Sequence, residues 1–463
     1  MTTHFSDIVG NVVLGSTALV LSSSVPAAIK EQAQILKEIY GDLVQICDGT
    51  DDDVQIQAAL DALPSMGGDV RLSEGTFTVA STITPPTLVN TNGVRILGAG
   101  RMATRITKDF NGDLFDILYT DTHKSNCEIG DFLVVGSAGT ETGRVIVAHA
   151  SVDTDASPDT TTYVYGLYLH DIYAYNLDGD VIEVRRVGVV DLERVEVADF
   201  GGNIGIWIHG GNVENIHLYS CKADGSNIAN SIGIQIGTDE AVGAIAHFSI
   251  TGLEVSRCGL YGLWVANGTF GDITNIGGED MADTAGVRIT GQNINLRGGQ
   301  IATPNNAIGV DINFGVQNSV QDIYMEGTGV GDTGYMIRAG ATDTRIERGR
   351  IFNYATPVND GGTGTRFKGI TGYVTEGNVL SPAFAIDGVA VITVTIPHGL
   401  DITPTVQDCQ LSIVEDTDVD DWAYGYAKVE SVGAVNVVAK VNVTTASATG
   451  GATAKLALRV NLT

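Results

Sequence analysis

The sequence has few basic residues and little charge of either sign. Of its 463 residues, 26 are Lys or Arg and 55 are Asp or Glu, so the formal net charge is −29. This excess of negative charge would repel nucleic acid and anionic membranes, and neither is expected as a partner. The arginines are scattered along the chain, so no basic stretch predicts that an anionic polysaccharide binds. Charged residues make up only 17% and hydrophobic residues 43%, which excludes a disordered chain.

Cysteines and uninterrupted apolar runs are also scarce. The five cysteines are odd in number, far apart and without Cys-x-x-Cys spacing, which predicts buried thiols and not a disulfide framework or a metal site. They are Cys47, Cys127, Cys221, Cys258 and Cys409. The apolar run from Ile8 to Val25 has no preceding Lys or Arg and is interrupted by Asn11, Gly15 and serines, so it favours neither a secretion signal nor a membrane helix. We expect a structured or attaching segment there.

Glycine is abundant, at 58 residues, and much of it belongs to a repeat. The repeated phrase is a glycine followed by an apolar, a variable and an apolar residue, and it recurs every 23 to 29 residues. It occurs at Gly205–Ile208, Gly233–Ile236, Gly262–Val265, Gly286–Ile289, Gly309–Ile312 and Gly334–Ile337. Such a repeat indicates a solenoid, and the alternation within the phrase indicates that each unit contributes a β-strand. The sequence therefore predicts an all-β fold built on a β-helix.

Other elements are expected on either side of the repeat. A short helix is predicted over Pro26–Tyr40 and another after Asp51–Asp53, followed by strands at Val70–Leu72 and Thr76–Val79. Beyond Tyr373, alternating strands separated by polar turns predict an antiparallel β-sandwich. The predicted domains are an N-terminal attachment segment over 1–44, a β-helix over 45–372 and a sandwich over 373–463.

The stretch before the repeat resembles a known superfamily. Its opening phrases are Asp48–Asp52, Ile56–Asp61, Gly67–Leu72, Glu74–Phe77 and Ile96–Arg101. They are similar to the start of the pectate-lyase-like right-handed parallel β-helix superfamily, which includes bacteriophage tailspikes and polysaccharide-degrading enzymes. The resemblance implies a right-handed parallel β-helix and a homotrimer that binds and cleaves a polysaccharide. It also implies an extracellular or virion-associated protein, in which the N-terminal segment would attach to the virion tail. The C-terminal module would mediate trimerisation or bind carbohydrate.

The variable third position of the repeat predicts one outward column of side chains. Because the flanking apolar residues point inward, the residues between them should face solvent, about 4.8 Å apart from coil to coil. The column comprises Glu183, Trp207, Gln235, Trp264, Arg288, Asp311 and Met336. Trp207 and Trp264 would stack on sugar rings unless a loop or second subunit covers them, with Gln235 beside them. Glu183, Asp311 and Arg288 are candidate catalytic residues.

A second outward column is predicted from the preceding strand of each coil, and it comprises Tyr173, Glu196, Tyr219, Glu254 and Tyr324. Glu196 and Glu254 should lie two coils apart, where side-chain lean could bring their carboxyls to the roughly 6.5–9.5 Å separation of an inverting glycosidase. Tyr173 and Tyr219 are candidate substrate-binding residues. The alternative is that both glutamates are ordinary solvated acids of an acidic surface.

Two further classes of function remain open at this stage. A polysaccharide lyase or epimerase would use Arg288 to neutralise charge, whereas an adhesin or structural fibre would keep the tryptophans without a productive acid pair. No cofactor is required and no metal motif is present. Calcium is an alternative, held by the acid clusters Asp178, Asp180 and Glu183 or Asp191, Glu193, Glu196 and Asp199.

Overall fold

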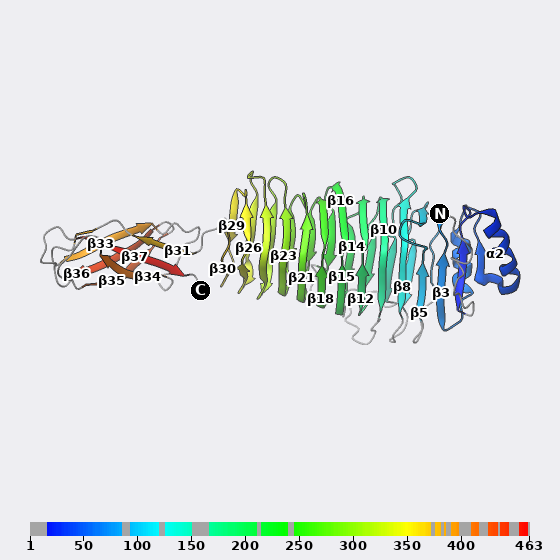
Figure 1. Ribbon diagram of the computed structural model, residues 1–463, viewed down its shortest axis with the longest axis horizontal. Helices are drawn as coiled ribbons and strands as arrows, with labels where there is room; N and C mark the ends of the chain where they lie inside the picture. Colours follow the sequence, from blue (N-terminus) through cyan, green and yellow to red (C-terminus); the bar gives the residue numbers. More distant parts are fainter. Residues whose placement is uncertain are drawn as a thin grey trace.

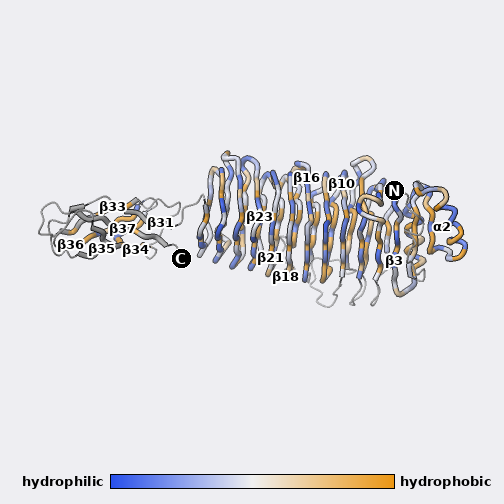
Figure 2. Tube along the Cα trace, viewed as in Figure 1, coloured by the Kyte–Doolittle hydropathy of each residue, from blue (hydrophilic) through white to orange (hydrophobic). Residues whose placement is uncertain are grey.

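The protein is a parallel β-solenoid followed by a C-terminal antiparallel β-module, as Figure 1 shows. The computed structural model describes 16–85, 93–119, 126–150, 166–210, 214–238 and 245–371, and seven C-terminal segments: 376–380, 384–385, 390–397, 409–415, 425–433, 436–443 and 453–461. The predicted fold class is confirmed. In Figure 2 the solenoid strands alternate between hydrophobic and hydrophilic residues, as expected when one face is buried.

One side of the solenoid is a parallel sheet of ten strands, here called sheet B. Its strands are β7 (Phe115–Tyr119), β9 (Ile146–Ala150), β11 (Ile182–Arg185), β14 (Ile204–His209), β17 (Ile232–Ile236), β20 (Tyr261–Val265), β22 (Ala285–Ile289), β24 (Ile308–Val316), β26 (Thr333–Thr342) and β29 (Thr356–Asp360). From β14 to β26 these strands contain the glycine repeat. The glycines face the interior, because a Cβ on Gly205 would lie 2.9 Å from Val197 Cγ2 and 3.1 Å from Phe200 Cε1.

The remaining sides form a parallel sheet of twenty strands, sheet A. Its strands are β1 (Thr17–Leu21), β2 (Val44–Ile46), β3 (Gly67–Leu72), β4 (Gly75–Val79), β5 (Gly93–Leu97), β6 (Thr104–Lys108), β8 (Cys127–Gly136), β10 (Leu167–Leu177), β12 (Val190–Glu193), β13 (Glu196–Phe200), β15 (Glu214–Tyr219), β16 (Lys222–Ile228), β18 (Ile245–Thr251), β19 (Glu254–Cys258), β21 (Gly268–Gly278), β23 (Gln292–Ala302), β25 (Ser319–Glu326), β27 (Arg345–Glu347), β28 (Arg350–Phe352) and β30 (Arg366–Lys368).

Sheet A bends along a line of residues in the left-handed conformation. In successive coils this line contains Asp171 (φ 50°), Arg194 (φ 54°), Ser220 (φ 52°) and Gly252 (φ 68°). Short polar residues and glycine tolerate this conformation better than most residues do. The bend divides sheet A into two strips: the first strip precedes the bend in each coil, and the second strip follows it.

The N-terminal end of the solenoid is closed by helices. Strand β1 pairs with both β2 and β3, so part of the predicted attachment segment belongs to sheet A. Helix α2 (Ala27–Tyr40) lies at this end in Figure 1, next to the 3-10 turn η1 (Gly41–Leu43). Helix α3 (Asp53–Asp61) begins at the predicted acidic run, where Asp52 Oδ2 accepts from the Thr78 amide of β4 at 2.8 Å. No helix among the described residues has the length and apolarity needed to cross a membrane.

The C-terminal strands form two antiparallel sheets. One contains β31 (Glu376–Leu380), β32 (Phe384–Ala385), β34 (Cys409–Glu415) and β37 (Thr453–Asn461), and the other contains β33 (Ala390–Pro397), β35 (Gly425–Val432) and β36 (Asn436–Val443). Their position and pairing agree with the predicted C-terminal module. None of the five cysteines, all of which the structure describes, forms a disulfide bond, as expected, and all except Cys409 are buried.

Candidate functional site

The outward column predicted on sheet B is in register. Trp207 pairs with both Glu183 and Gln235, and Gln235 pairs with Trp264, which confirms that the two tryptophans lie two coils apart. Arg288, Asp311 and Met336 continue the column. The expected exposure is wrong for three members, because Glu183, Gln235 and Asp311 are buried.

Glu183 is buried because nitrogen-bearing side chains from three coils converge on it. Its Oε2 lies 2.5 Å from Arg144 Nε, and its Oε1 lies 3.0 Å from Arg185 Nε and 2.8 Å from His209 Nε2. Burial alone would raise the pKa of Glu183, but the hydrogen bond with His209 and the charges of Arg144 and Arg185 lower it overall. Trp207 stacks on the His209 ring at a centroid distance of 3.6 Å and donates to the Gly237 carbonyl at 3.2 Å.

The rest of this column is also occupied by partners within the chain. Arg338 donates to both carboxylate oxygens of Asp311, at 2.7 and 3.1 Å. The Arg288 guanidinium lies over the rings of Tyr261 and Trp264, 4.9 and 5.5 Å from their centroids. The Gln235 amide donates to the Gly237 carbonyl at 2.9 Å, as Trp207 does. These contacts hold the side chains of the column in place without a substrate.

The second predicted column lies on the second strip of sheet A, with one correction. Tyr173 pairs with Glu196, Glu196 with Lys222, and Lys222 with Glu254, so Lys222 occupies the place expected for Tyr219. The two glutamates are two coils apart as predicted. However, Glu196 is paired with Arg101, and Glu254 Oε1 lies 2.8 Å from Lys222 Nζ. Tyr173 stacks on Tyr175 at a centroid distance of 5.1 Å, beneath the Arg101 guanidinium.

A groove of about 710 Å³ lies beside Glu254. Its lining contains Gly277, Gly278 and Gly299, as well as the acidic residues Glu279 and Asp280, but no aromatic ring among the described residues. This groove therefore offers carboxylates but no flat apolar surface for a sugar ring.

A different groove, of about 650 Å³, combines carboxylates with aromatic rings. It lies on the first strip of sheet A, and we call it the strip-one groove. The side chains that define it are Glu128 of β8, Tyr168 of β10, Asp191 and Glu193 of β12, and His217 and Tyr219 of β15. Tyr219, predicted to bind substrate, lies here and is 53% exposed. The lining comes from four successive coils, so the groove extends along the solenoid, which suits a polymer better than a small molecule.

Strand alternation places Asp191 and Glu193 on the same face of β12. Leu192 and Val190 point into the core, while the two acids are half-buried in the groove. Because the two positions are two residues apart on one strand, their α-carbons are separated by roughly 6.6 Å. In neighbouring coils, Asp191 pairs with Tyr168 and His217, and Glu193 pairs with His170 and Tyr219.

The two acids have different environments. Glu193 Oε2 accepts from the Tyr168 hydroxyl at 2.7 Å, and its Oε1 is paired with Arg194. Among the described residues, no side chain or amide donates to Asp191, and burial raises its pKa, an effect that His217 partly offsets. A carboxyl with a raised pKa can donate a proton, whereas the contacts of Glu193 with a hydroxyl and a guanidinium fix the position of its carboxylate.

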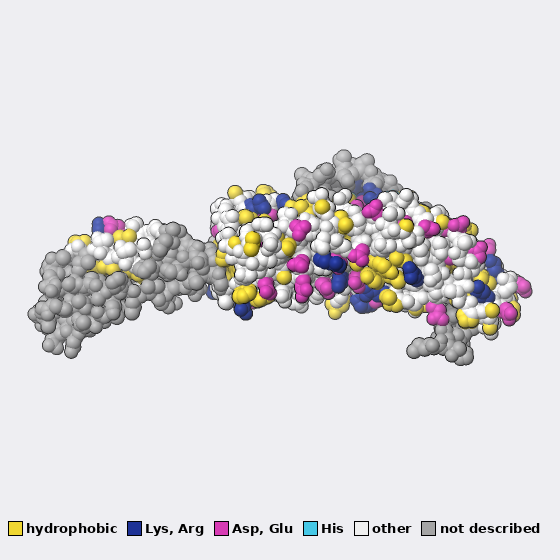
Figure 3. Space-filling model, turned by 90° about the horizontal axis from the view of Figure 1, so that it is seen from above, with side chains coloured by type: hydrophobic (Ala, Val, Ile, Leu, Met, Phe, Trp, Pro, Cys, Tyr) yellow, Lys and Arg dark blue, Asp and Glu magenta, His cyan; other side chains and the backbone are white. Residues whose placement is uncertain are grey.

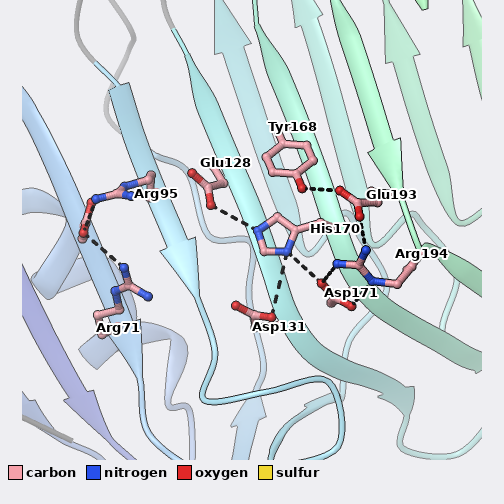
Figure 4. A network of polar contacts seen from close by, with 10 residues as sticks. Arg71, Arg95, Glu128, Asp131, Tyr168, His170, Asp171, Glu193 and Arg194 are labelled. Atoms are coloured by element: carbon pink, nitrogen blue, oxygen red, sulfur yellow. Dashed lines mark hydrogen bonds and ion pairs between the residues drawn. The ribbon is translucent and has the colours of Figure 1, made fainter. Parts of the chain in front are cut away.

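A polar network below the groove holds these side chains in place (Figure 4). His170 Nε2 lies 3.1 Å from Glu128 Oε1, and His170 Nδ1 lies 3.2 Å from Asp171 Oδ2. Arg194 donates to both oxygens of Asp171 at 2.7 and 2.6 Å and reaches Glu193 as well. The ring of His170 also stacks on Tyr168, at a centroid distance of 4.6 Å. The orientation of both Tyr168 and Glu193 is therefore fixed.

Asp131, His170 and Asp171 also lie close enough together to hold a metal ion. Both oxygens of Asp171 already accept from Arg194, and burial raises the pKa of Asp131. Calcium, an alternative from the sequence, has no further support from these contacts. In the first sequence-based calcium cluster, Glu183 is already engaged by Arg144, Arg185 and His209. The second cluster is divided between two strands, with Asp191 and Glu193 on β12 and Glu196 and Asp199 on β13.

Sequence reasoning named Asp191 and Glu193 only as members of an acidic cluster. It did not single out Tyr168. The alternation Val190-Asp-Leu-Glu193 does indicate two outward acids, but their aromatic neighbours come from Tyr168 and Tyr219, which lie in other coils. Figure 3 shows acidic, basic and hydrophobic side chains interspersed along the face it views, so charge alone does not mark one site.

No protein-family model matches the sequence, and no curated relative matches it. Solved structures with a similar course of the chain include the tailspike gp61 of Pseudomonas phage phi297, at 11% identity and a TM-score of 0.47, covering 94% of this chain and 95% of that one. The A-module of the mannuronan C-5 epimerase AlgE4 of Azotobacter vinelandii has 13% identity and a TM-score of 0.45, with 68% and 96% covered.

The DFA-IIIase of Arthrobacter chlorophenolicus A6 in complex with GF2 has 10% identity and a TM-score of 0.41, with 71% of this chain and 93% of that one covered. At such low identities and TM-scores, the fold of the present chain is established by its own strand pairing.

Proposed function

We propose that the protein binds a polysaccharide in the strip-one groove and hydrolyses it. The observation that carries this proposal is the unequal environment of two outward acids, Asp191 and Glu193, between two tyrosines. Asp191 would protonate the leaving glycosidic oxygen. Glu193, held by Tyr168 and Arg194, would activate water, and Tyr219 would stack on a sugar ring.

The spacing of the two acids favours hydrolysis with inversion. If the side chains of Asp191 and Glu193 extend from β12 in parallel, their carboxyl groups are as far apart as their α-carbons, roughly 6.6 Å. This separation lies in the range of inverting glycosidases. Elimination is the alternative, with Tyr168 as the base. It is less well supported, because burial raises the pKa of Tyr168 and so makes the phenolate harder to form at neutral pH.

The test is a screen of bacterial surface and extracellular polysaccharides. Hydrolysis predicts new reducing ends without absorbance in the ultraviolet, whereas elimination predicts absorbance from unsaturated ends. Unchanged polymers throughout a broad panel would contradict both mechanisms and favour a non-catalytic adhesin or fibre.

The pH dependence of hydrolysis should depend on His217. As general acid, Asp191 must be protonated, so activity falls when the pH rises through its pKa. The His217 charge lowers the pKa of Asp191, so removing that charge should raise it. We expect His217→Gln to move the alkaline limb of the kcat/KM profile to higher pH. An unchanged limb, or a shift to lower pH, would contradict the role of Asp191.

We further propose a homotrimer that attaches to a virion tail through its N-terminal segment and acts outside the cell. The apolar outer side of α2 supports an attachment role, because Ile35 and Ile39 are 59% and 66% exposed. Light scattering of the dilute full-length chain should give three times the mass of the 48.5 kDa chain. A mass of one chain would contradict the trimer.

A further inference from the structure

The first strip of sheet A carries one polar column along most of the solenoid. Starting at β12, each member pairs with the next in the following coil. The members are Asp191, His217, Ser249, Asp272, Asn295, Ser319, Arg345 and Arg366. The column begins in the strip-one groove and ends at two arginines. None of its members is apolar, so a hydroxyl-rich polymer could lie along it.

The arginine pair at the end of the column is electrostatically unfavourable by itself. Arg345 and Arg366 are in register on β27 and β30, and backbones of such strands are roughly 4.8 Å apart. Both side chains are exposed, and neither forms an ion pair with any residue that the structure describes. Like charges directly opposite one another destabilise a sheet. In a chain with a net charge of −29, an arginine pair that forms no ion pair with the described residues is therefore unusual.

The two arginines line a depression of about 540 Å³ together with amide and hydroxyl side chains. These are Asn293, Asn295, Gln317, Ser319 and Gln321. Asp343 and Glu347 also line the depression, but Glu347 is paired with Arg348 at 3.5 Å. Guanidinium groups bind carboxylates and sulfates through paired hydrogen bonds, and amides and hydroxyls suit sugar hydroxyls. The chemistry of this set fits a negatively charged sugar.

We propose that Arg345 and Arg366 bind an anionic unit of the same polymer whose glycosidic bond lies in the strip-one groove. This inference rests on the proposed function and names its substrate class as an acidic heteropolysaccharide. Six strand spacings separate Asp191 from Arg345, or roughly 29 Å, about the length of six sugar units. The unit in the acidic strip-one groove would be neutral and the distal unit charged.

Affinity electrophoresis in gels that contain dextran sulfate or uncharged dextran tests the anion site. We expect dextran sulfate, but not dextran, to retard the wild-type protein, and the retardation to weaken with salt. The double variant Arg345→Gln/Arg366→Gln should bind at least about tenfold more weakly, since hydrogen bonds to charged groups are lost. The control is Arg105→Gln, because Arg105 is also exposed and has no ion pair among the described residues, but lies on the second strip.

Two results would overturn the anion site: equal mobility of the wild type in both gels, or equal retardation of the double variant. Loss of retardation in the double variant without cleavage of any glycan would leave the anion site standing and refute the proposed hydrolysis. Once a polymer that the protein cleaves has been identified, the double variant should show a KM about tenfold higher than the wild type for long chains. Its KM for short oligosaccharides should be unchanged. An equal effect on both lengths would refute the distal position.

Discussion

Asp191→Asn should lower kcat by roughly 10² to 10⁴, with KM little changed, because an amide cannot protonate the leaving oxygen in the transition state. Glu193→Gln should have a comparable effect, since the activated water would lose its base. The initial rate of reducing-end release measures both. The substitutions keep the shape of the side chains, and unchanged thermal unfolding would show that the fold is intact.

The matched controls are Glu196→Gln and Glu254→Gln on the second strip, the pair predicted from the sequence. If the strip-one groove is the site, both variants should retain turnover to within a few-fold, because these carboxylates are already paired with Arg101 and Lys222. The opposite pattern, in which the controls lose activity and Asp191→Asn retains it, would restore the sequence-based assignment.

Gly278→Ala should prevent correct stacking of the solenoid coils. A Cβ at this position would lie 1.7 Å from the Val255 carbonyl oxygen of the preceding coil and 2.8 Å from Met281 Cγ. The backbone of one coil would therefore have to move away from the next, at a cost of about 3 kcal/mol or more. We expect a marked loss of soluble protein and a lower unfolding temperature.

The neighbouring residue provides the control for this prediction. A Cβ on Gly277 would meet nothing within 4 Å, and neither glycine of the pair has a φ in the left-handed region. Gly277→Ala should therefore leave the soluble yield and the unfolding temperature close to those of the wild type. Equal damage from both substitutions would mean that loss of chain flexibility, and not contact between coils, is responsible.

The fold was predictable because the glycine repeat shows which residues of successive coils are equivalent. The same phrase occurs in each coil of sheet B, so Trp207, Gln235 and Trp264 could be aligned from the sequence alone. The burial of side chains in this column could not be predicted in the same way. Glu183 is covered by Arg144, which lies one coil earlier, and no local pattern connects the two.

Sheet A has no such phrase, so its strands could not be aligned from the sequence in the same way. Tyr219 precedes the bend residue Ser220, whereas Glu254 follows Gly252, so the two side chains lie on different strips. Alternation within a strand cannot reveal this, because a left-handed residue changes the direction of the chain without a distinctive apolar signal. For the same reason the strip-one groove, built from four coils, could not be assembled from the sequence.

The most direct test of the central claim is digestion in water enriched in the heavy oxygen isotope, followed by mass analysis of the fragments. If Glu193 activates water, each new reducing end should carry one heavy oxygen atom, and Asp191→Asn should form such fragments at least about 10² more slowly than the wild type. Fragments that lack the label and are lighter by one water would show elimination and contradict the account.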